Sequence, residues 1–127
     1  MTLARKTPLA RGSAKLRRKR INAVSAKRRA YRASAEGQRG LAYMQAVKML
    51  PCVVCGAPGP NEAHHCINGR HGSRKASDFD TIPLCQSDHR TGPLAIHNGP
   101  KSWAKRNGPD TGFIPQTRAA VRRMEEA

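Results

Sequence analysis

The stretch PCVVCGAPGPNEAHHC, residues 51–66, holds three of the four cysteines and two of the five histidines of this 127-residue chain. Cys52 and Cys55 form a CxxC pair followed by Gly56. This is the pattern of a zinc knuckle, in which a tight turn presents two thiolates and the glycine lets backbone amides point at sulfur. Aromatic residues make up only 4% of the chain, so apolar burial alone is a weak basis for a fold. The stretch therefore predicts a small domain whose fold is stabilised by a bound zinc ion.

A structural zinc site needs two more ligands, and the segment LCQSDH offers them. Asp88 stands three residues after Cys85, where a second CxxC pair would place Cys or His, and an Asp oxygen is a permitted but less common zinc ligand. Cys66 is the competing fourth ligand. A CxxC pair also occurs as two small buried hydrophobes or as a redox pair, but no thioredoxin-like βαβ pattern follows it here. The predicted closed site is Cys52, Cys55, Cys85 and Asp88.

A second set of candidate ligands consists of histidines. His64 and His65 are neighbours, and side chains of neighbouring residues on an extended segment point to opposite sides, so both do not easily bind one ion. One imidazole can hold a metal while the other takes a proton from water, because its pKa lies near neutrality. His89 and His97 would complete a three-ligand site with open positions. Asp80 is expected to orient the neighbouring imidazole through a hydrogen bond. On the residues alone, a surface histidine pair or extra zinc ligands remain alternatives.

The charge of the chain indicates a polyanionic partner. The formal net charge is +16, and residues 1–35 contain 12 of the 24 Lys and Arg but no Asp or Glu. This composition predicts a DNA-binding tail over 1–35 whose early part is disordered when free. There is no apolar run long enough to span a membrane and no signal-peptide segment, so a soluble, cytoplasmic protein is expected. The candidate DNA contacts in the tail are Arg17, Arg18, Lys19 and Arg20.

Helical segments are predicted on both sides of a metal-rich core over 51–98. The Ala-rich sequence from about 22 to 50 favours helix, with a break expected at Gly37 and Gly40. Short helices are expected at about 100–107 and 115–126, where Pro115 suits the first helical turn. Trp103 is expected to pack in the core rather than to stack on a nucleic-acid base. The predicted class is α+β, with one folded domain over 36–127.

The order of these motifs resembles a known family. AHH, then D(x3)LC, then H, in a small Cys-bearing core, is similar to the HNH endonucleases with their ββα-metal fold. The likeness is closest to the Ref family of phage RecA-dependent nucleases. It runs from residue 51 to about 113, through the segments PCVVCGAPGPNEAHH, GRHGSRKASDFD, IPLCQSDHRTG, LAIH and SWAKRNGPD. It implies a zinc-stapled ββα-metal core flanked by helices, with a basic N-terminal extension.

The resemblance also assigns roles to individual residues. It makes His64 a metal ligand and His65 the general base, with Asp80 at the position of the family's Asn. His89, expected on the helix of the ββα unit, and His97 become the remaining ligands, although the gap RTGPLAI before His97 is longer than in many HNH proteins. Asp88 also departs from the family, which usually has Cys or His at that position.

The activity implied by the resemblance is hydrolysis of DNA phosphodiester bonds that leaves a 5′ phosphate. Its cofactors would be structural Zn and catalytic Mg or Mn, for which Zn can substitute. Its partners would be DNA and a RecA filament, with neither a membrane nor a small-molecule substrate, in a bacterial host cell that carries the phage or prophage.

The loop GRHGSRK after the histidine pair supplies Arg70, Arg74 and Lys75. These cations are either phosphate contacts that position DNA or simply a solvated loop. The alternative to a nuclease is a noncatalytic zinc-finger DNA-binding protein. A small RNA-binding zinc protein would also fit the charge, but it leaves the pattern of His65, Asp80 and His89 without a purpose.

Overall fold

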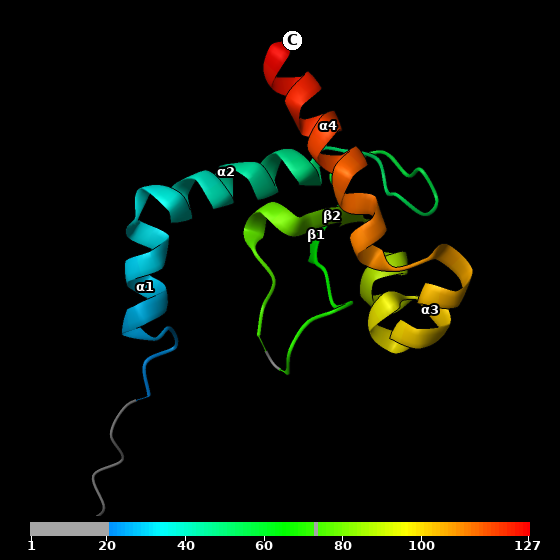
Figure 1. The fold of residues 1–127 in the computed structure, drawn as a ribbon, viewed down its shortest axis with the longest axis horizontal. Coiled ribbons are helices and arrows are strands. Elements are labelled where there is room, and N and C mark those ends of the chain that lie inside the picture. Colours follow the sequence, from blue (N-terminus) through cyan, green and yellow to red (C-terminus); the bar gives the residue numbers. More distant parts are fainter. Residues whose placement is uncertain (1–20, 73) are drawn as a thin grey trace, which may run out of the picture.

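The computed structural model describes residues 21–72 and 74–127, which form helices around a small sheet. Helix α1 (Ala26–Ala33) and helix α2 (Ala35–Lys48) come first, followed by strands β1 (Glu62–His65) and β2 (Thr81–Leu84). Helix α3 (Pro100–Asn107) and helix α4 (Ile114–Glu126) complete the chain (Figure 1). The α+β class and the two C-terminal helices are therefore confirmed. The tail contacts predicted at 17–20 lie outside the described residues.

The break between the first two helices lies at Ser34, so the prediction of a break at Gly37 and Gly40 was wrong. The backbone of Ser34 is extended, its N–H donates to Ala30 O at 3.1 Å, and its Oγ accepts from Gly37 N at 3.0 Å. One residue thus ends α1 and caps α2. A Cβ on Gly37 would lie 1.9 Å from Tyr31 O, so this glycine lets the two helices meet.

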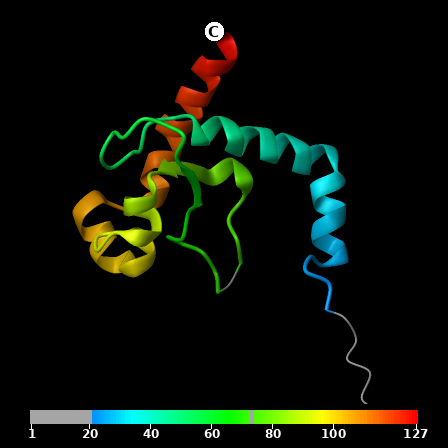
Figure 2. The same cartoon turned by 180° about the vertical axis from the view of Figure 1, so that it is seen from behind.

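Helix α1 lies within the segment that was predicted to be tail. It turns sharply away from the N-terminal end of α2, as two opposite views show (Figure 1 and Figure 2). The folded part of the chain therefore begins earlier than residue 36. The helix itself agrees with the prediction from the Ala-rich sequence over 22–50, whereas the tail boundary at 35 followed the charge, since AKRRAYRA carries four cations.

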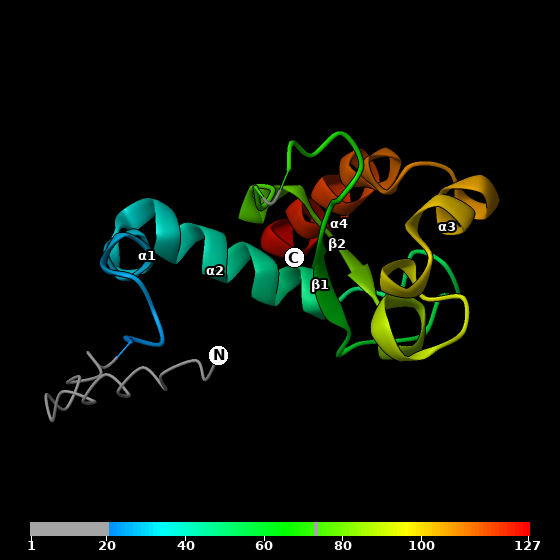
Figure 3. The ribbon, with the colours of Figure 1, turned by 90° about the horizontal axis from the view of Figure 1, so that it is seen from below.

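The sheet contains two antiparallel strands. Glu62 pairs with Leu84 and His65 with Thr81, and every residue of β2 is buried. Helix α2 packs against both strands, and α4 packs against β2. Figure 1 and Figure 3 show α1 and α3 at opposite ends of the molecule, with the sheet between them. Among the described residues, no helix is both long and apolar enough to cross a bilayer.

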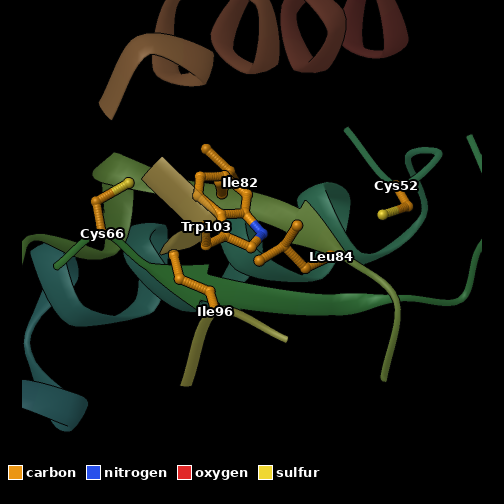
Figure 4. Close-up of a cluster of buried hydrophobic side chains, with 6 residues drawn as sticks. All are labelled: Cys52, Cys66, Ile82, Leu84, Ile96 and Trp103. Carbon is orange, nitrogen blue, oxygen red and sulfur yellow. The ribbon is translucent and has the colours of Figure 1, made fainter. Parts of the chain in front are cut away.

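The apolar core is small and lies on one side of the sheet. Ile82, Leu84, Ile96 and Trp103 gather at its centre (Figure 4). Trp103 is 1% exposed, which confirms its predicted place in the core. Because so few large side chains are buried, crosslinks through bound metal would add much to the stability of this fold.

Candidate metal centres

Three cysteines and one aspartate come together, as predicted, at the edge of the core. Their ligand atoms all lie within 4.8 Å of one another. The sulfur atoms of Cys55 and Cys85 are 3.7 Å apart. Two thiolates on a tetrahedral zinc ion, each about 2.3 Å from it, would be about 3.8 Å apart. The structure therefore brings Cys52, Cys55, Cys85 and Asp88 into a group that could hold a metal ion.

The turn that carries the CxxC pair is built by its glycine. Gly56 has φ +74, a conformation that favours glycine, and its N–H donates to Cys52 O at 2.9 Å. Val53 N donates to Pro83 O at 3.1 Å, which ties the turn to β2 and so to Cys85. Burial raises the pKa of the Cys85 thiol to about 12, and a divalent cation would reverse this by binding the thiolate.

Asp88, rather than Cys66, is the fourth member of the cysteine group. Its Oδ2 lies 3.4 Å from Cys52 Sγ and 3.2 Å from Cys85 Sγ. Burial opposes ionisation of Asp88, but hydrogen bonds from the thiols hold its pKa below the usual range. Cys66 instead belongs to the apolar core, where it lies on the other side of Trp103 from Cys52 (Figure 4). Burial raises the pKa of the Cys66 thiol to about 12.

The three predicted histidine ligands also come together. His64 is on β1, His89 on the single π-helical turn Ser87–Thr91, and His97 on the short turn Ile96–Asn98. Their ligand atoms lie within 4.8 Å of one another, and the Nε2 atoms of His89 and His97 are 3.0 Å apart. Where the resemblance implied a helix for His89, the structure has one turn. This turn still directs the ring toward His64, at 5.1 Å between ring centroids.

Carboxylates fix the orientation of two of these imidazoles. Asp110 Oδ2 lies 3.0 Å from His64 Nε2, and Glu62 accepts a hydrogen bond from His89 Nδ1. In each ring the nitrogen that faces the carboxylate carries the proton, so the other nitrogen keeps its lone pair. His64 Nδ1 is buried and has no hydrogen-bond partner among the described residues. A metal ion would satisfy this nitrogen, so the residues present fit a metal site.

Neither carboxylate was predicted. Asp110 is 46 residues from His64, and its second role is to accept hydrogen bonds from Ile67 N at 2.6 Å and Asn68 N at 3.1 Å. No local pattern points to such a contact. Glu62 could have been found, because it stands two residues before His64 and therefore shares its side of the strand.

The local electrostatics favour neutral imidazoles. Burial lowers the pKa of His89, and Glu62 offsets only part of that effect. Burial also lowers the pKa of His97, and repulsion from His89 adds to the decrease. Neutral rings keep the lone pairs that a metal ion requires, so the group is suited to bind a cation near neutral pH.

His65 points to the other face of the strand and is held by Asp78. Its Nε2 lies 2.8 Å from Asp78 Oδ1. Burial lowers the pKa of His65, although the carboxylate of Asp78 favours the protonated ring. Tyr31 OH donates to the second oxygen of Asp78 at 3.2 Å. His65 is thus a largely buried, oriented imidazole beside the three-histidine group.

The prediction that Asp80 orients a neighbouring imidazole through a hydrogen bond was wrong. Asp80 accepts from Arg118 of α4 instead. Residues 78–80 form one 3-10 turn, and side chains two residues apart in such a turn point in different directions. Asp78 therefore meets His65, while Asp80 turns toward α4.

The basic loop between the strands borders the three-histidine group and His65. Arg70, Arg74 and Lys75 are exposed and line a cavity of about 260 Å³. The charge of Arg70 contributes to the lowered pKa of His97, and that of Lys75 to the lowered pKa of His65. The loop therefore places positive charge near the candidate metal ligands and near the oriented imidazole.

Comparison with known proteins gives one family. The family model DUF968, described as a protein of unknown function, matches residues 21–120, and the chain belongs to this family. The matched region includes α1, both candidate metal groups and Asp110. No curated protein and no solved structure matches the chain.

Proposed function

We propose that this protein is a metal-dependent DNA endonuclease of the HNH type. One observation carries the proposal. His64, His89 and His97 form a three-ligand group, and His65, adjacent to His64, stays outside it in a hydrogen bond with Asp78. A closed structural site has no use for an additional oriented imidazole, whereas hydrolysis needs a base next to an open metal site.

Each group suits a different ion. Three thiolates and one carboxylate close together favour Zn, so the cysteine group would hold the structural ion. The histidine group would hold Mg or Mn during catalysis, and Zn can substitute there because imidazole also binds it well. Three protein ligands leave coordination positions for water and for a phosphate oxygen.

In the proposed reaction, His65 takes a proton from the water that attacks phosphorus. Asp78 holds the ring so that Nδ1 faces the water, because Nε2 is engaged with the carboxylate. Arg70 and Lys75 bind phosphate oxygens and position the DNA without reading its sequence. The histidine group would hold a divalent cation, which would supply stabilisation of the negative charge that develops during hydrolysis.

RecA belongs to the proposal through the resemblance of residues 51–113 to the Ref family. Single-stranded DNA covered by RecA would act as the activating partner. The alternative is a noncatalytic DNA-binding protein stapled by zinc, for which the cysteine group alone would be sufficient.

The deciding experiment is cleavage of plasmid DNA by the full chain with Mg or Mn, with and without RecA filaments. The variant His65→Ala should fall about 10²- to 10⁴-fold in rate, the usual contribution of a general base, while keeping its zinc and its DNA affinity. His71→Ala is the matched control, because His71 is exposed and lies outside both groups. If wild-type protein never cuts DNA under any of these conditions, the noncatalytic alternative replaces the proposal.

A further inference from the structure

We infer that the cationic face of α1 binds the phosphate backbone of the nucleic acid strand next to the site of cleavage. This inference rests on the proposed function, because it assigns the substrate a path across the molecule. It differs from the predicted tail contacts, since α1 is a folded helix that packs against α2. Its cations lie within the DNA-binding tail predicted over 1–35, but the individual contacts predicted there were at 17–20.

The distribution of charge on α1 is the first support. The helix has four cations and no acidic residue, and none of its residues is buried. None of the four makes an ion pair with any residue that the structure describes. The three alanines at 26, 30 and 33 lie on one side of the helix, and helical spacing places Arg28 and Arg32 on the opposite side, with the other two cations on the flanks. The cations are Lys27, Arg28, Arg29 and Arg32.

A cavity beside this face is the second support. It has a volume of about 450 Å³ and lies between α1 and α2, where Arg28, Arg32 and Tyr31 line one wall. The positive charges of Arg28 and Arg32 contribute to a lowered pKa of Lys75, which places all three cations near one another. Cations gathered in this way repel one another, and a phosphate group would relieve that repulsion.

The link to His65 is the third support. Asp78 uses one oxygen to bind His65 at 2.8 Å and the other to accept from Tyr31 at 3.2 Å. The same carboxylate fits against Gly40 of α2, where a Cβ would lie 2.8 Å from Asp78 Oδ2. Helix α1 is therefore held in a fixed relation to the proposed base. A phosphate on Arg28 and Arg32 would lie beside the nucleotide presented to His65.

The test measures how the affinity for a short labelled DNA duplex depends on salt, without added Mg or Mn. The double variant Arg28→Ala, Arg32→Ala should lower the magnitude of the slope of log K against log salt by about 0.9 for each phosphate that the variant no longer neutralises. The matched control is Arg122→Ala, Arg123→Ala on α4, which removes the same charge from exposed positions. The control slope should stay closer to that of wild type. The pair Arg28→Lys, Arg32→Lys should retain the slope because it keeps both charges.

Equal decreases of the slope in the two alanine pairs would overturn the inference, since net charge alone would then explain binding. An unchanged slope in Arg28→Ala, Arg32→Ala would overturn it as well. Circular dichroism of each variant establishes that the fold is retained, as expected for exposed positions. The outcome is separable from the proposed function: DNA that binds through α1 but is never cut refutes the nuclease, whereas cutting with an unchanged slope refutes only the role of α1.

Discussion

The carboxylate of Asp78 joins two elements that are far apart in the sequence, because it accepts hydrogen bonds from both His65 and Tyr31. The distances are 2.8 Å and 3.2 Å, over separations of 13 and 47 residues. His65 belongs to the sheet and Tyr31 to α1. This single side chain therefore relates the orientation of the proposed base to the position of the basic helix.

Replacing Asp78 by Ala should reduce kcat for DNA cleavage by about 10- to 100-fold, the usual cost of removing a residue that orients a site. The reason is that the His65 ring would be without the partner that fixes its Nε2. Single-turnover cleavage measures the effect. Asp80→Ala is the matched control and should cleave at close to the wild-type rate, since Asp80 contacts Arg118 instead. A larger decrease in Asp80→Ala would restore the role first expected for that residue.

Tyr31→Phe should lower kcat several-fold and leave the affinity for DNA unchanged. The substitution removes one hydroxyl that donates to Asp78 but keeps the ring and the charge of α1. Tyr43→Phe provides the comparison, because the Tyr43 hydroxyl has no hydrogen-bond partner among the described residues. Saturation kinetics and equilibrium binding separate the two parameters. A fall in affinity without a fall in kcat would count against a positioning role for Tyr31.

Zinc content should depend on Asp88 and not on Cys66. Asp88→Ala should lower both zinc affinity and thermal stability, whereas Asp88→Cys should bind zinc at least as tightly as wild type because it completes a set of four thiolates. Cys66→Ser should keep its zinc, since that thiol lies outside the group of four candidate ligands. Metal analysis after competition with a chelator gives the ranking. Absence of zinc in Cys66→Ser alone would contradict this ligand assignment.

Asp110→Asn should weaken metal binding at the histidine group by about 10- to 100-fold. The amide carries no charge to orient His64, and its NH₂ group would face one of the donors that now bind the carboxylate. Titration with Mn, followed by its paramagnetic effect on water relaxation, measures the affinity. Asp80→Asn serves as the control with the same chemical change. Equal affinities in the two variants would remove Asp110 from the metal site.

The thiol of Cys66 should resist alkylation in the folded chain. Its pKa is raised to about 12 by burial, so the thiol stays protonated below that pH and little of the reactive thiolate forms near pH 8. Cys55 is exposed, so removal of zinc by a chelator should open it to iodoacetamide before Cys66 reacts. Peptide mass spectrometry identifies the labelled residue. Rapid labelling of Cys66 in the zinc-loaded chain would show that it is not buried in solution.

The spacing of residues was enough to predict the cysteine group, because it is built from two short motifs that each need only a tight turn. Cys52 with Cys55, and Cys85 with Asp88, are three residues apart and need only a tight turn to meet. The opposite directions of His64 and His65 also follow from strand geometry alone.

Contacts that depend on tertiary packing were missed. Asp110 reaches His64 only because the chain from α3 returns to the sheet, and no local pattern reports that path. The choice between Asp78 and Asp80 depends on a single 3-10 turn, which the sequence does not distinguish from an extended approach to β2. The helix break was misplaced because glycine at 37 serves close packing rather than a bend.

The alternation of β1 has a consequence for how this site can change over evolution. His64 and His65 differ in role only because one occupies an even position and the other an odd position of the same strand. One residue inserted between them would put both rings on the metal side, and one inserted before His64 would separate it from the side of Glu62. Under the proposed roles, the position along these four residues separates ligand from base, so insertions would be tolerable only outside the strand.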